Sequence, residues 1–419
     1  MIPNDSTTHT RCCVVGGGPA GMMLGFLLAR AGVEVTVLEK HRDFLRDFRG
    51  DTIHPSTLEL ISELGFLEEF LRQPHQEEST LTVDVGGTEL PVVDFTHLPT
   101  RCQFMALMPQ WDFLNFLVSH AQHLSTFKLC LEHEVLDLVF DQDDRVVGVR
   151  GKNPDGDFEL HADLVVGSDG RHATTRESAG LKVIDLGAPM DVLWMRVGKG
   201  RDAGRRVALG HAVPGSIFIT LDRSDYWQCG LVIPKGSAET VKARGLPALR
   251  EELVRIVPEL SDGIEVLDSW EKVKLLTVAV DRLASWHRPG LLCIGDAAHA
   301  MSPIGGVGIN LAIQDAVATA NLLAQPLSEK GRVLAEEELA AVQQRREWPT
   351  KLTQRMQVFL QNRIIRQVLG QETTTKFSIP WQLRLLQYWP WLRRIPARVI
   401  GLGFRPEHVR TPEATLEQA

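Results

Sequence analysis

A glycine-rich turn near the start of the chain has the residue types and spacing that bind a phosphate group. Residues 11–15 form an apolar, strand-like run, and Gly-Gly-Gly-Pro-Ala-Gly follows at positions 16–21. In a GxGxxG turn the first glycine permits the tight turn, the second lets the backbone approach a pyrophosphate, and the third allows helix and strand to pack closely. The free N–H groups of the helix that follows attract an anion. We therefore predict a dinucleotide site with the contact residues Gly16, Gly18, Pro19, Ala20 and Gly21.

An acidic residue ends the next predicted strand, which covers residues 33–39. Glu39 lies 18 residues after the last glycine of the turn, where a carboxylate can accept hydrogen bonds from both hydroxyls of a ribose. Lys40 follows it directly and is included among the candidate cofactor contacts. The alternative is a glycine-rich turn in an ordinary βαβ unit, and the motif alone does not separate FAD from NAD.

Two further motifs follow predicted strands later in the chain. Residues 162–171 form a strand that ends in Asp169-Gly170, which alone is also typical of a hairpin turn. The other motif is stronger: Gly-Asp-Ala-Ala-His at 295–299 is followed by Gly-Gly-Val-Gly-Ile-Asn at 305–310. Asp296 at a strand end can bind polyol hydroxyls, and N–H groups at the start of the next helix can stabilise negative charge. The glycines of this motif expose such N–H groups at the start of a predicted helix over residues 310–323.

The elements that position these motifs can be read from periodicity and turn residues. We expect a helix over 56–71 that starts at Pro55-Ser56 with Glu59 as its capping-box partner, and a hairpin over 81–95 that turns at Gly86-Gly87. The remaining expected elements are a helix over 111–124, strands over 128–150, a mixed sheet over 191–277 with a helix at 246–257, and helices over 334–369 and 381–399.

Together these elements predict an α/β fold in which a Rossmann-like dinucleotide-binding domain is interrupted by a β-rich insert. The predicted nucleotide-binding domain is discontinuous and comprises residues 11–75, 100–180 and 285–330. A mixed β-sheet domain for substrate would comprise residues 76–99 and 181–284, and a helical C-terminal region residues 331–410.

Composition narrows the class of protein. With 419 residues, 44% of them hydrophobic and 23% charged, the chain is typical of a globular protein and not of a disordered or collagen-like one. Its apolar runs are shorter than the ~20 residues of a membrane span, and residues 1–11 lack a signal-peptide core, so we expect a cytoplasmic protein.

Six cysteines show no metal-ligand spacing, and no metal is expected; Cys12, Cys13 and Cys293 should be buried.

Charge is unevenly distributed along the chain. The net charge of −8 argues against nucleic-acid binding, yet residues 355–410 hold ten Lys or Arg against two acids, a net charge of +8. This region also carries Trp381, Trp389 and Trp391, a combination suited to an anionic membrane surface. We favour the alternative, that these helices pack on the acidic remainder of the chain, because Pro380, Pro390 and Pro396 interrupt any long amphipathic helix.

The three motifs, in this order, resemble the single-component FAD-dependent aromatic hydroxylases typified by p-hydroxybenzoate hydroxylase. The resemblance covers residues 11–323 and implies a glutathione-reductase-type FAD domain. It also implies a monooxygenase that uses NAD(P)H and O2 through a flavin C4a-hydroperoxide to hydroxylate an aromatic, polyketide or quinone-like small molecule. NAD(P)H would bind transiently, because the chain has no second GxGxxG.

The resemblance also implies roles for individual residues. Arg49 would contact the flavin phosphates, Gln110 the ribityl chain, and the backbone of Val135 the adenine. Asp296 would bind the ribityl hydroxyls, and the N–H groups that contact the flavin ring would come from Gly308, Ile309 and Asn310. Asp169 and Gly170 would serve both nucleotides, and Pro303 would lie beside the oxygen-reactive edge of the flavin. His54 is the candidate for a polar pocket residue or a proton donor near pH 7, and its alternative is a solvent-facing histidine at a helix start.

Two departures limit the transfer of roles. Ala173 replaces the serine usual three residues after the glycine of the Asp-Gly motif, and only Tyr226 and Tyr388 are available to build a phenol-activating network. The substrate therefore stays open, as does the oligomeric state. Alternative functions are a flavin-dependent reductase of a lipophilic prenyl substrate and a non-catalytic flavin-bound scaffold.

Overall fold

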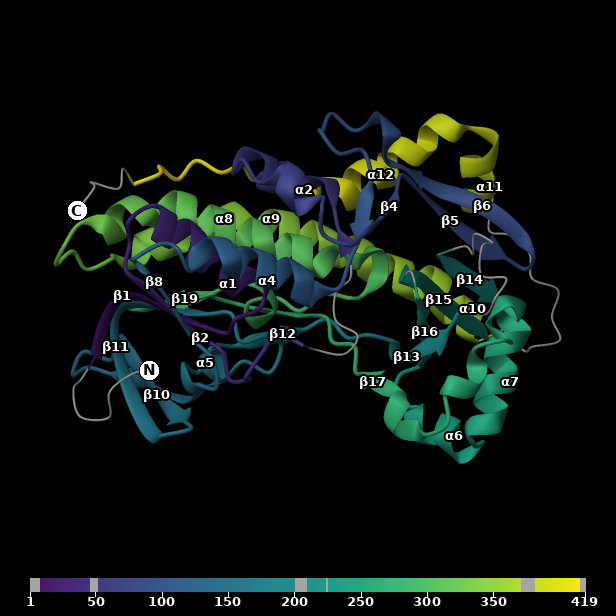
Figure 1. The fold of residues 1–419 in the computed structure, drawn as a ribbon, viewed down its shortest axis with the longest axis horizontal. Coiled ribbons are helices and arrows are strands. Elements are labelled where there is room, and N and C mark those ends of the chain that lie inside the picture. Colours follow the sequence, from purple (N-terminus) through teal and green to yellow (C-terminus); the bar gives the residue numbers. More distant parts are fainter. Residues whose placement is uncertain (1–7, 46–51, 200–208, 224, 371–380, 415–419) are drawn as a thin grey trace.

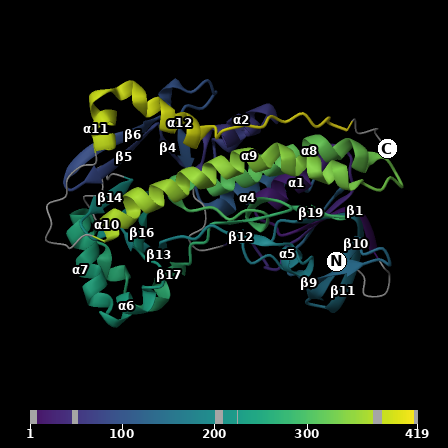
Figure 2. The same ribbon diagram turned by 180° about the vertical axis from the view of Figure 1, so that it is seen from behind.

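The computed structural model describes residues 8–45, 52–199, 209–223, 225–370 and 381–414. Two large sheets lie at opposite ends of an elongated molecule, and the long helices α8 (Val307–Ser328) and α9 (Glu336–Leu360) run lengthwise along it (Figures 1 and 2). A π-helical turn (Gln361–Ile365) and α10 (Arg366–Leu369) continue α9 to the second sheet. The mixed α/β fold predicted from the sequence is confirmed.

The first sheet has eight strands within the described residues, and its centre is parallel. The parallel order is β20-β11-β1-β2-β8, and β1 pairs with β11 from Thr8↔Leu160 to Val15↔Gly167. Its central strands read as near-continuous apolar runs because helices such as α1 (Pro19–Arg30) cover the sheet. Cys12, Cys13 and Cys293 are fully buried here, as predicted. The strands are β1 (Thr8–Val15), β2 (Val35–Leu38), β8 (Phe127–Cys130), β9 (Glu134–Phe140), β10 (Val146–Asn153), β11 (Gly156–Gly167), β19 (His287–Arg288) and β20 (Leu291–Cys293).

The second sheet has seven strands in the described part of the chain, in the order β17-β13-β16-β15-β14-β5-β6. It is mixed, since β14 pairs in parallel with β5 while its other neighbours are antiparallel. One face packs on α6 (Ala238–Ala243) and α7 (Leu246–Ile256) through residues such as Trp227 and Leu253. The strands are β5 (Thr80–Val85), β6 (Thr88–Asp94), β13 (Met190–Gly198), β14 (Gly210–Val213), β15 (Ser216–Arg223), β16 (Tyr226–Pro234) and β17 (Lys274–Leu276).

The opposite face of the second sheet approaches the start of α8. Ile304 packs against Met190, Val192 and Val232, which alternate with the residues that contact α6 and α7. The predicted hairpin at Gly86-Gly87 is confirmed and contributes β5 and β6 to this sheet. The proposed domain boundaries stay a prediction, although the sheets draw their strands from the expected segments.

Small sheets and short helices connect these parts. The three-stranded sheet consists of β3 (Thr52–Ile53), β4 (Gln76–Glu78) and β7 (Met105–Leu107), and the two-stranded sheet of β12 (Val183–Asp185) and β18 (Asp281–Leu283). The remaining helices of this part are α2 (Pro55–Glu63), α3 (Leu67–Phe70), α4 (Gln110–Ala121) and α5 (Thr174–Ser178).

The helix predicted over residues 56–71 is interrupted, and its capping box is wrong. Gly65, at φ +84°, separates α2 from α3. The N-cap of α2 is His54, so Glu59 is not in the N3 position, and its carboxylate instead accepts the backbone N–H of Arg101 at 3.0 Å. The signal failed because a capping box requires a Ser or Thr at the N-cap itself.

The C-terminal region forms short helices followed by an extended segment. α11 (Trp381–Tyr388), a 3-10 turn (Pro390–Arg393) and α12 (Arg394–Gly401) precede residues 403–414, which we call the C-terminal strap. α12 buries Ala397 and Gly401 against the neighbourhood of Phe95, as the intramolecular alternative requires. Trp389 and Trp391 are nevertheless more than half exposed.

One helical stretch, Ile304–Ser328, is long and apolar enough to cross a membrane by length and composition. Within its most apolar window, 78% is buried inside the fold. The apolar character is therefore accounted for by packing against the first sheet and α1.

Candidate functional site

The three sequence motifs meet at one edge of the first sheet. The glycine turn follows β1, Asp169 follows β11, and the Gly295–His299 turn follows β20; these strands are parallel neighbours. Glu39 follows β2 on the other side of β1. Since the carboxyl ends of parallel strands share an edge, residues separated by more than 250 positions in sequence surround one location, the standard place for a ligand in such sheets.

The glycine turn has the shape needed to cradle a pyrophosphate. An added Cβ at Gly16 would lie 2.5 Å from the carbonyl oxygen of Ser168, and one at Gly21 would lie 2.0 Å from the carbonyl oxygen of Gly16. These two glycines are therefore required by the protein itself. Gly18 has an ordinary φ of −74°, and an added Cβ there would meet no described atom within 4 Å. The small size of Gly18 therefore leaves space beside the start of α1. The first turn of α1 carries neither an acidic residue nor a side-chain cap, so its free N–H groups suit an anionic group.

Glu39 is buried next to this turn. Its carboxylate accepts the backbone N–H groups of Gly17 and His41, each at 3.0 Å. The backbone of Glu39 also bonds Cys130 and His133, which leads into β9 and places Val135 in the same neighbourhood. The acid is thus held in place, as its predicted role at a ribose demands.

Asp169 has an internal structural partner that the sequence did not reveal. Its two carboxylate oxygens accept the hydroxyl of Thr175 at 2.7 Å and the N–H of Thr175 at 3.0 Å, at the start of α5. Desolvation raises the pKa of Asp169 against the opposing effect of these bonds. The preceding residue, Ser168, donates to the carbonyls of Val15 and Gly16 at 2.9 Å and so joins two of the motifs.

The third motif forms a turn between two helices. Gly295, at φ +58°, lies against Ala20 of α1 and Ala312 of α8, so the turn that carries Asp296 touches both helix starts. Asp296 is half-buried. Gly305 and Gly306 have φ values of +76° and +63° and lead into α8, whose first turn also lacks acids and a side-chain cap. A second uncapped helix start therefore points to this region.

The Asn310 side chain is fully engaged within the protein. Its Oδ1 accepts the backbone N–H of His54 at 2.9 Å and the hydroxyl of Thr57 at 2.7 Å, and its Nδ2 donates to the carbonyl of Thr52 at 3.1 Å. Only its backbone is left for the predicted contact with a flavin. The side chain instead fixes α2 and β3 to the start of α8.

His54 is completely buried, so the solvent-facing alternative is wrong. Its Nδ1 lies 2.7 Å from the carbonyl oxygen of Ile400 in α12, and because a carbonyl only accepts, Nδ1 carries the proton. Burial lowers the pKa of His54 to about 4, although the bond to Ile400 opposes this. A neutral imidazole cannot be the proton donor near pH 7 that the sequence suggested. Its Nε2 is a buried acceptor without a described hydrogen-bond partner.

The other predicted residues lie in different surroundings. Gln110 begins α4, which packs on α1, and Val135 is buried in β9. Lys40 is exposed, and Pro303 precedes the turn into α8. Arg49 lies outside the described residues. The cofactor contacts of all these residues stay predictions.

A buried polar cluster behind the third motif was missed by sequence reasoning. His299 lies 2.6 Å from Asp315, which is also bonded to Arg346 at 2.9 Å. Burial would raise the pKa of Asp315, but His299 and Arg346 outweigh burial and lower it. No short motif could have revealed this cluster, because its members come from a turn and two separate helices.

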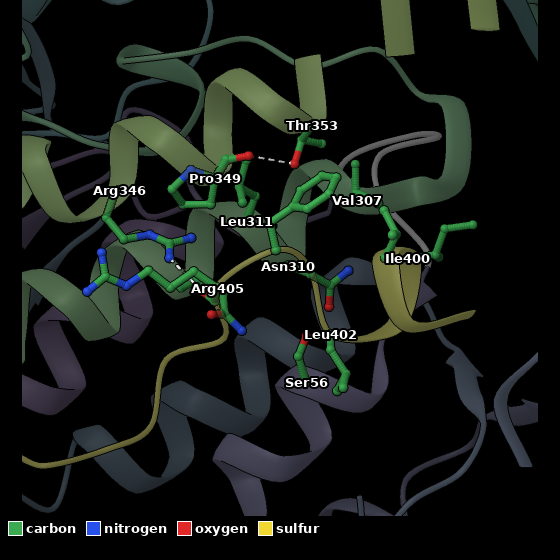
Figure 3. A pocket seen from close by; sticks show the side chains of 14 residues that line it. Ser56, Val307, Asn310, Leu311, Arg346, Pro349, Thr353, Ile400, Leu402 and Arg405 are labelled. Carbon is green, nitrogen blue, oxygen red and sulfur yellow. Dashed lines mark hydrogen bonds between the residues drawn. The ribbon is translucent and has the colours of Figure 1, made fainter. Parts of the chain in front are cut away.

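A small cavity of about 30 Å³ lies beside this cluster, between α8, α9, α2 and the C-terminal strap (Figure 3). Arg346, Gln314 and Arg405 are among the residues that line it. Its volume is sufficient for about two water molecules, far below that of a ligand site. It is therefore too small to hold the cofactor, although Asn310 at the start of α8 is among its lining residues.

Taken together, the parallel sheet, the glycine cradle and the two uncapped helix starts indicate a dinucleotide-binding protein. Comparison with known proteins makes this specific: residues 9–356 match the FAD binding domain family. The chain belongs to this family and is an FAD-dependent monooxygenase. The resemblance to the p-hydroxybenzoate hydroxylase group is confirmed.

The relatives include monooxygenases named for 6-methylpretetramide and for para-nitrophenol. 6-Methylpretetramide 4-monooxygenase of Streptomyces rimosus is 35% identical over 367 residues, which cover 87% of this chain and 86% of that protein. Para-nitrophenol 4-monooxygenase of Pseudomonas sp. (strain WBC-3) is 25% identical over 312 residues, which cover 72% of this chain and 75% of that protein. The solved structure of p-nitrophenol 4-monooxygenase PnpA from Pseudomonas putida DLL-E4 shares the fold, with a TM-score of 0.75, 21% identity and coverage of 95% of this chain and 100% of that one.

Proposed function

We propose that this monooxygenase hydroxylates a phenolic ring of a polycyclic, polyketide-type aromatic compound with NAD(P)H and O2. Support for the substrate class comes from the relative that shares 35% identity over most of both chains and acts on 6-methylpretetramide. The observation that carries the phenol assignment is the buried, neutral His54 with its bare Nε2.

The residues around the sheet edge would hold FAD. The cradle at Gly18 and the start of α1 would bind the pyrophosphate, Glu39 the adenosine ribose, and Asp296 the ribityl hydroxyls. The start of α8 would direct the N–H groups of Gly308, Ile309 and Asn310 toward the ring, whose negative charge they favour. Bound FAD would supply the reduction of O2 and the transfer of one oxygen atom to the substrate, while the second oxygen leaves as water.

The second sheet would provide the wall of the substrate site. Trp194 and Ile219 are half-buried between two apolar clusters on the face that approaches Ile304. Trp194 also lies flat against Gly230, where an added Cβ would be 3.1 Å from the indole. Half-buried aromatic and aliphatic side chains beside the turn at Pro303 suit a flat, apolar ring system.

His54 would accept a hydrogen bond from the substrate hydroxyl at Nε2. Ile400 fixes the tautomer and Asn310 fixes the backbone, so this acceptor is held in one orientation. A hydroxyl that donates a hydrogen bond pushes electron density into its ring, and hydroxylation requires an electron-rich ring carbon. The imidazole would therefore orient and polarise the phenol without itself being protonated.

The test compares wild type with His54→Asn and with a matched control at an exposed histidine, His123→Asn. Purified protein should show flavin absorbance, and NAD(P)H oxidation with oxygen uptake should be stimulated by polycyclic phenols. Loss of a hydrogen bond of about 1.5–3 kcal/mol should lower the kcat of His54→Asn about 10- to 100-fold, while His123→Asn should be unchanged.

The pH profile separates this role from a general loss of structure. Raising the pH toward ~10, where a phenol ionises unaided, should restore activity to His54→Asn relative to wild type. A variant whose deficit is constant with pH would contradict the acceptor role. Substrate-dependent NAD(P)H oxidation without oxygen uptake would indicate the reductase alternative, and no oxidation with any phenol would indicate the scaffold.

A further inference from the structure

The C-terminal strap reaches the cofactor-binding turn through a chain of buried charged groups. Glu407, in the strap, is 2% exposed, and its carboxylate accepts from Arg345 at 2.7 Å and from Arg346 at 3.3 Å. Arg346 is 1% exposed and also donates to the carbonyl of Arg405 at 2.9 Å, the contact drawn in Figure 3. Its Nε donates to Asp315 at 2.9 Å.

Asp315 completes the connection to the third motif. Its other carboxylate oxygen accepts the backbone N–H of Gly295 at 3.1 Å and lies 2.6 Å from Nε2 of His299. These two residues bracket Asp296, and the turn is closed on itself by the bond from the N–H of His299 to the carbonyl of Gly295 at 2.8 Å. Every carboxylate oxygen of Asp315 is thus used to join α9 to the turn.

This chain of charged groups from Glu407 through Arg346 to Asp315, which we call the relay, depends on each of its charges. Asp315 and Glu407 are balanced by Arg345 and Arg346, and in the described structure three of these four residues are almost completely buried. Without the Glu407 charge, the positive charge of buried Arg346 is no longer fully compensated, which is unfavourable. Arg346 would then move relative to Asp315 to reduce this cost. A shift of Asp315 would displace the Gly295–His299 turn.

We infer that Glu407 is a positioning residue for the cofactor: the strap sets the affinity for FAD by holding the turn that carries Asp296. The inference rests on the proposed contact of Asp296 with FAD. Glu407 is the point at which the strap enters this buried charged network, and its backbone N–H also donates to Gln314 of α8 at 2.5 Å. By contrast, the strap pairs Arg30–Glu413 and His408–Glu63 lie nearer the surface.

The test measures the FAD dissociation constant of full-length apoprotein by flavin fluorescence, together with the unfolding temperature without FAD. We expect Glu407→Gln to raise the Kd about tenfold, the usual size of coupling between linked sites, and to shift the visible bands of bound FAD. Glu413→Gln is the matched control, because it removes an acid from the same strap at a residue whose side chain is 74% exposed. Glu413→Gln should leave the Kd and the visible bands of bound FAD unchanged. Glu407→Asp, which keeps the charge, should recover part of the affinity that Glu407→Gln loses.

Wild-type affinity and spectrum in a folded Glu407→Gln protein would overturn the inference. If that variant does not fold, Arg345→Gln replaces it, because Arg345 bonds Glu407 from a position whose side chain is 25% exposed. An unchanged Kd in Arg345→Gln would then overturn it as well. Asp296→Ala distinguishes failure of the relay from failure of the proposed FAD contact. If Asp296→Ala binds FAD weakly while the Glu407 variant binds it normally, only the relay is refuted. If Asp296→Ala binds FAD normally, the proposed placement of the cofactor is refuted.

Discussion

Substitution of two glycines in the same turn should separate cofactor binding from folding. In Gly21→Ala, the added Cβ would lie 2.0 Å from the carbonyl oxygen of Gly16 and 2.6 Å from Oγ of Ser168. Overlap with backbone belongs at the upper end of overpacking costs, about 3 kcal/mol, and the better helix propensity of alanine returns about 1 kcal/mol. The net expected loss in the free energy of unfolding is therefore about 2 kcal/mol.

Gly18→Ala should behave in the opposite way. No described atom lies within 4 Å of the new Cβ and the φ of −74° suits alanine, so the stability of the apoprotein should change by less than about 1 kcal/mol. The methyl group would occupy the space proposed for the pyrophosphate. A clash of about 1–3 kcal/mol there corresponds to an FAD Kd raised about 5- to 150-fold.

The assay is denaturant unfolding of both apoproteins, with FAD binding followed by flavin fluorescence. Gly18→Ala should unfold like wild type and bind FAD weakly, while Gly21→Ala should be destabilised even without FAD. Wild-type FAD affinity in Gly18→Ala would refute the argument that the open space at this glycine is the pyrophosphate cradle.

Three further outcomes follow from features of the site and the C-terminal region. Asp296→Ala should raise the FAD Kd more than about tenfold while the unfolding temperature of the apoprotein is unchanged, because the Asp296 side chain is only half-buried; unchanged flavin occupancy would rule out its role. The pKa of His54 is about 4 in the folded protein and 6.5 in the unfolded chain. Protonation therefore does not affect folding above pH 6.5, and as the pH falls from 6.5 toward 4 the free energy of unfolding decreases by about 3 kcal/mol. His54→Asn should remove that slope from acid unfolding curves, and an identical slope would show that other groups produce it. We expect full-length protein to stay in the supernatant with anionic liposomes at low salt, because prolines divide the C-terminal segment; salt-sensitive co-sedimentation that is lost when Trp389 and Trp391 become alanine would show a membrane contact instead.

The sequence predicted those parts of the site that depend on local pattern. The glycine turn, Glu39 and the Gly295–His299 turn each follow an apolar strand, and parallel strands bring their ends to one edge, so the meeting of these motifs follows from the fold class. The hairpin at Gly86-Gly87 was likewise visible because its turn residues are local.

Features that depend on tertiary contacts could not be predicted. The burial of His54 is caused by α8 and α12, and its bond to Ile400 spans 346 positions. Glu59 matched a capping box in sequence, but its carboxylate is bound by a residue 42 positions away. Glu407 belongs to no motif at all, and its carboxylate obtains the partners Arg345 and Arg346 because α9 packs between the strap and Asp315.

The order in which the chain is synthesised affects when the cofactor site can form. The glycine turn and its neighbour β2 leave the ribosome before the rest of the site, since β1 obtains its partner β11 only after residue 160. β20 follows at residues 291–293, and the strap more than 100 residues later. Nascent chains fold as their partners emerge. We therefore expect FAD to be retained only after the strap has emerged, and the apolar surfaces of β1 and α1 to need protection from aggregation until then.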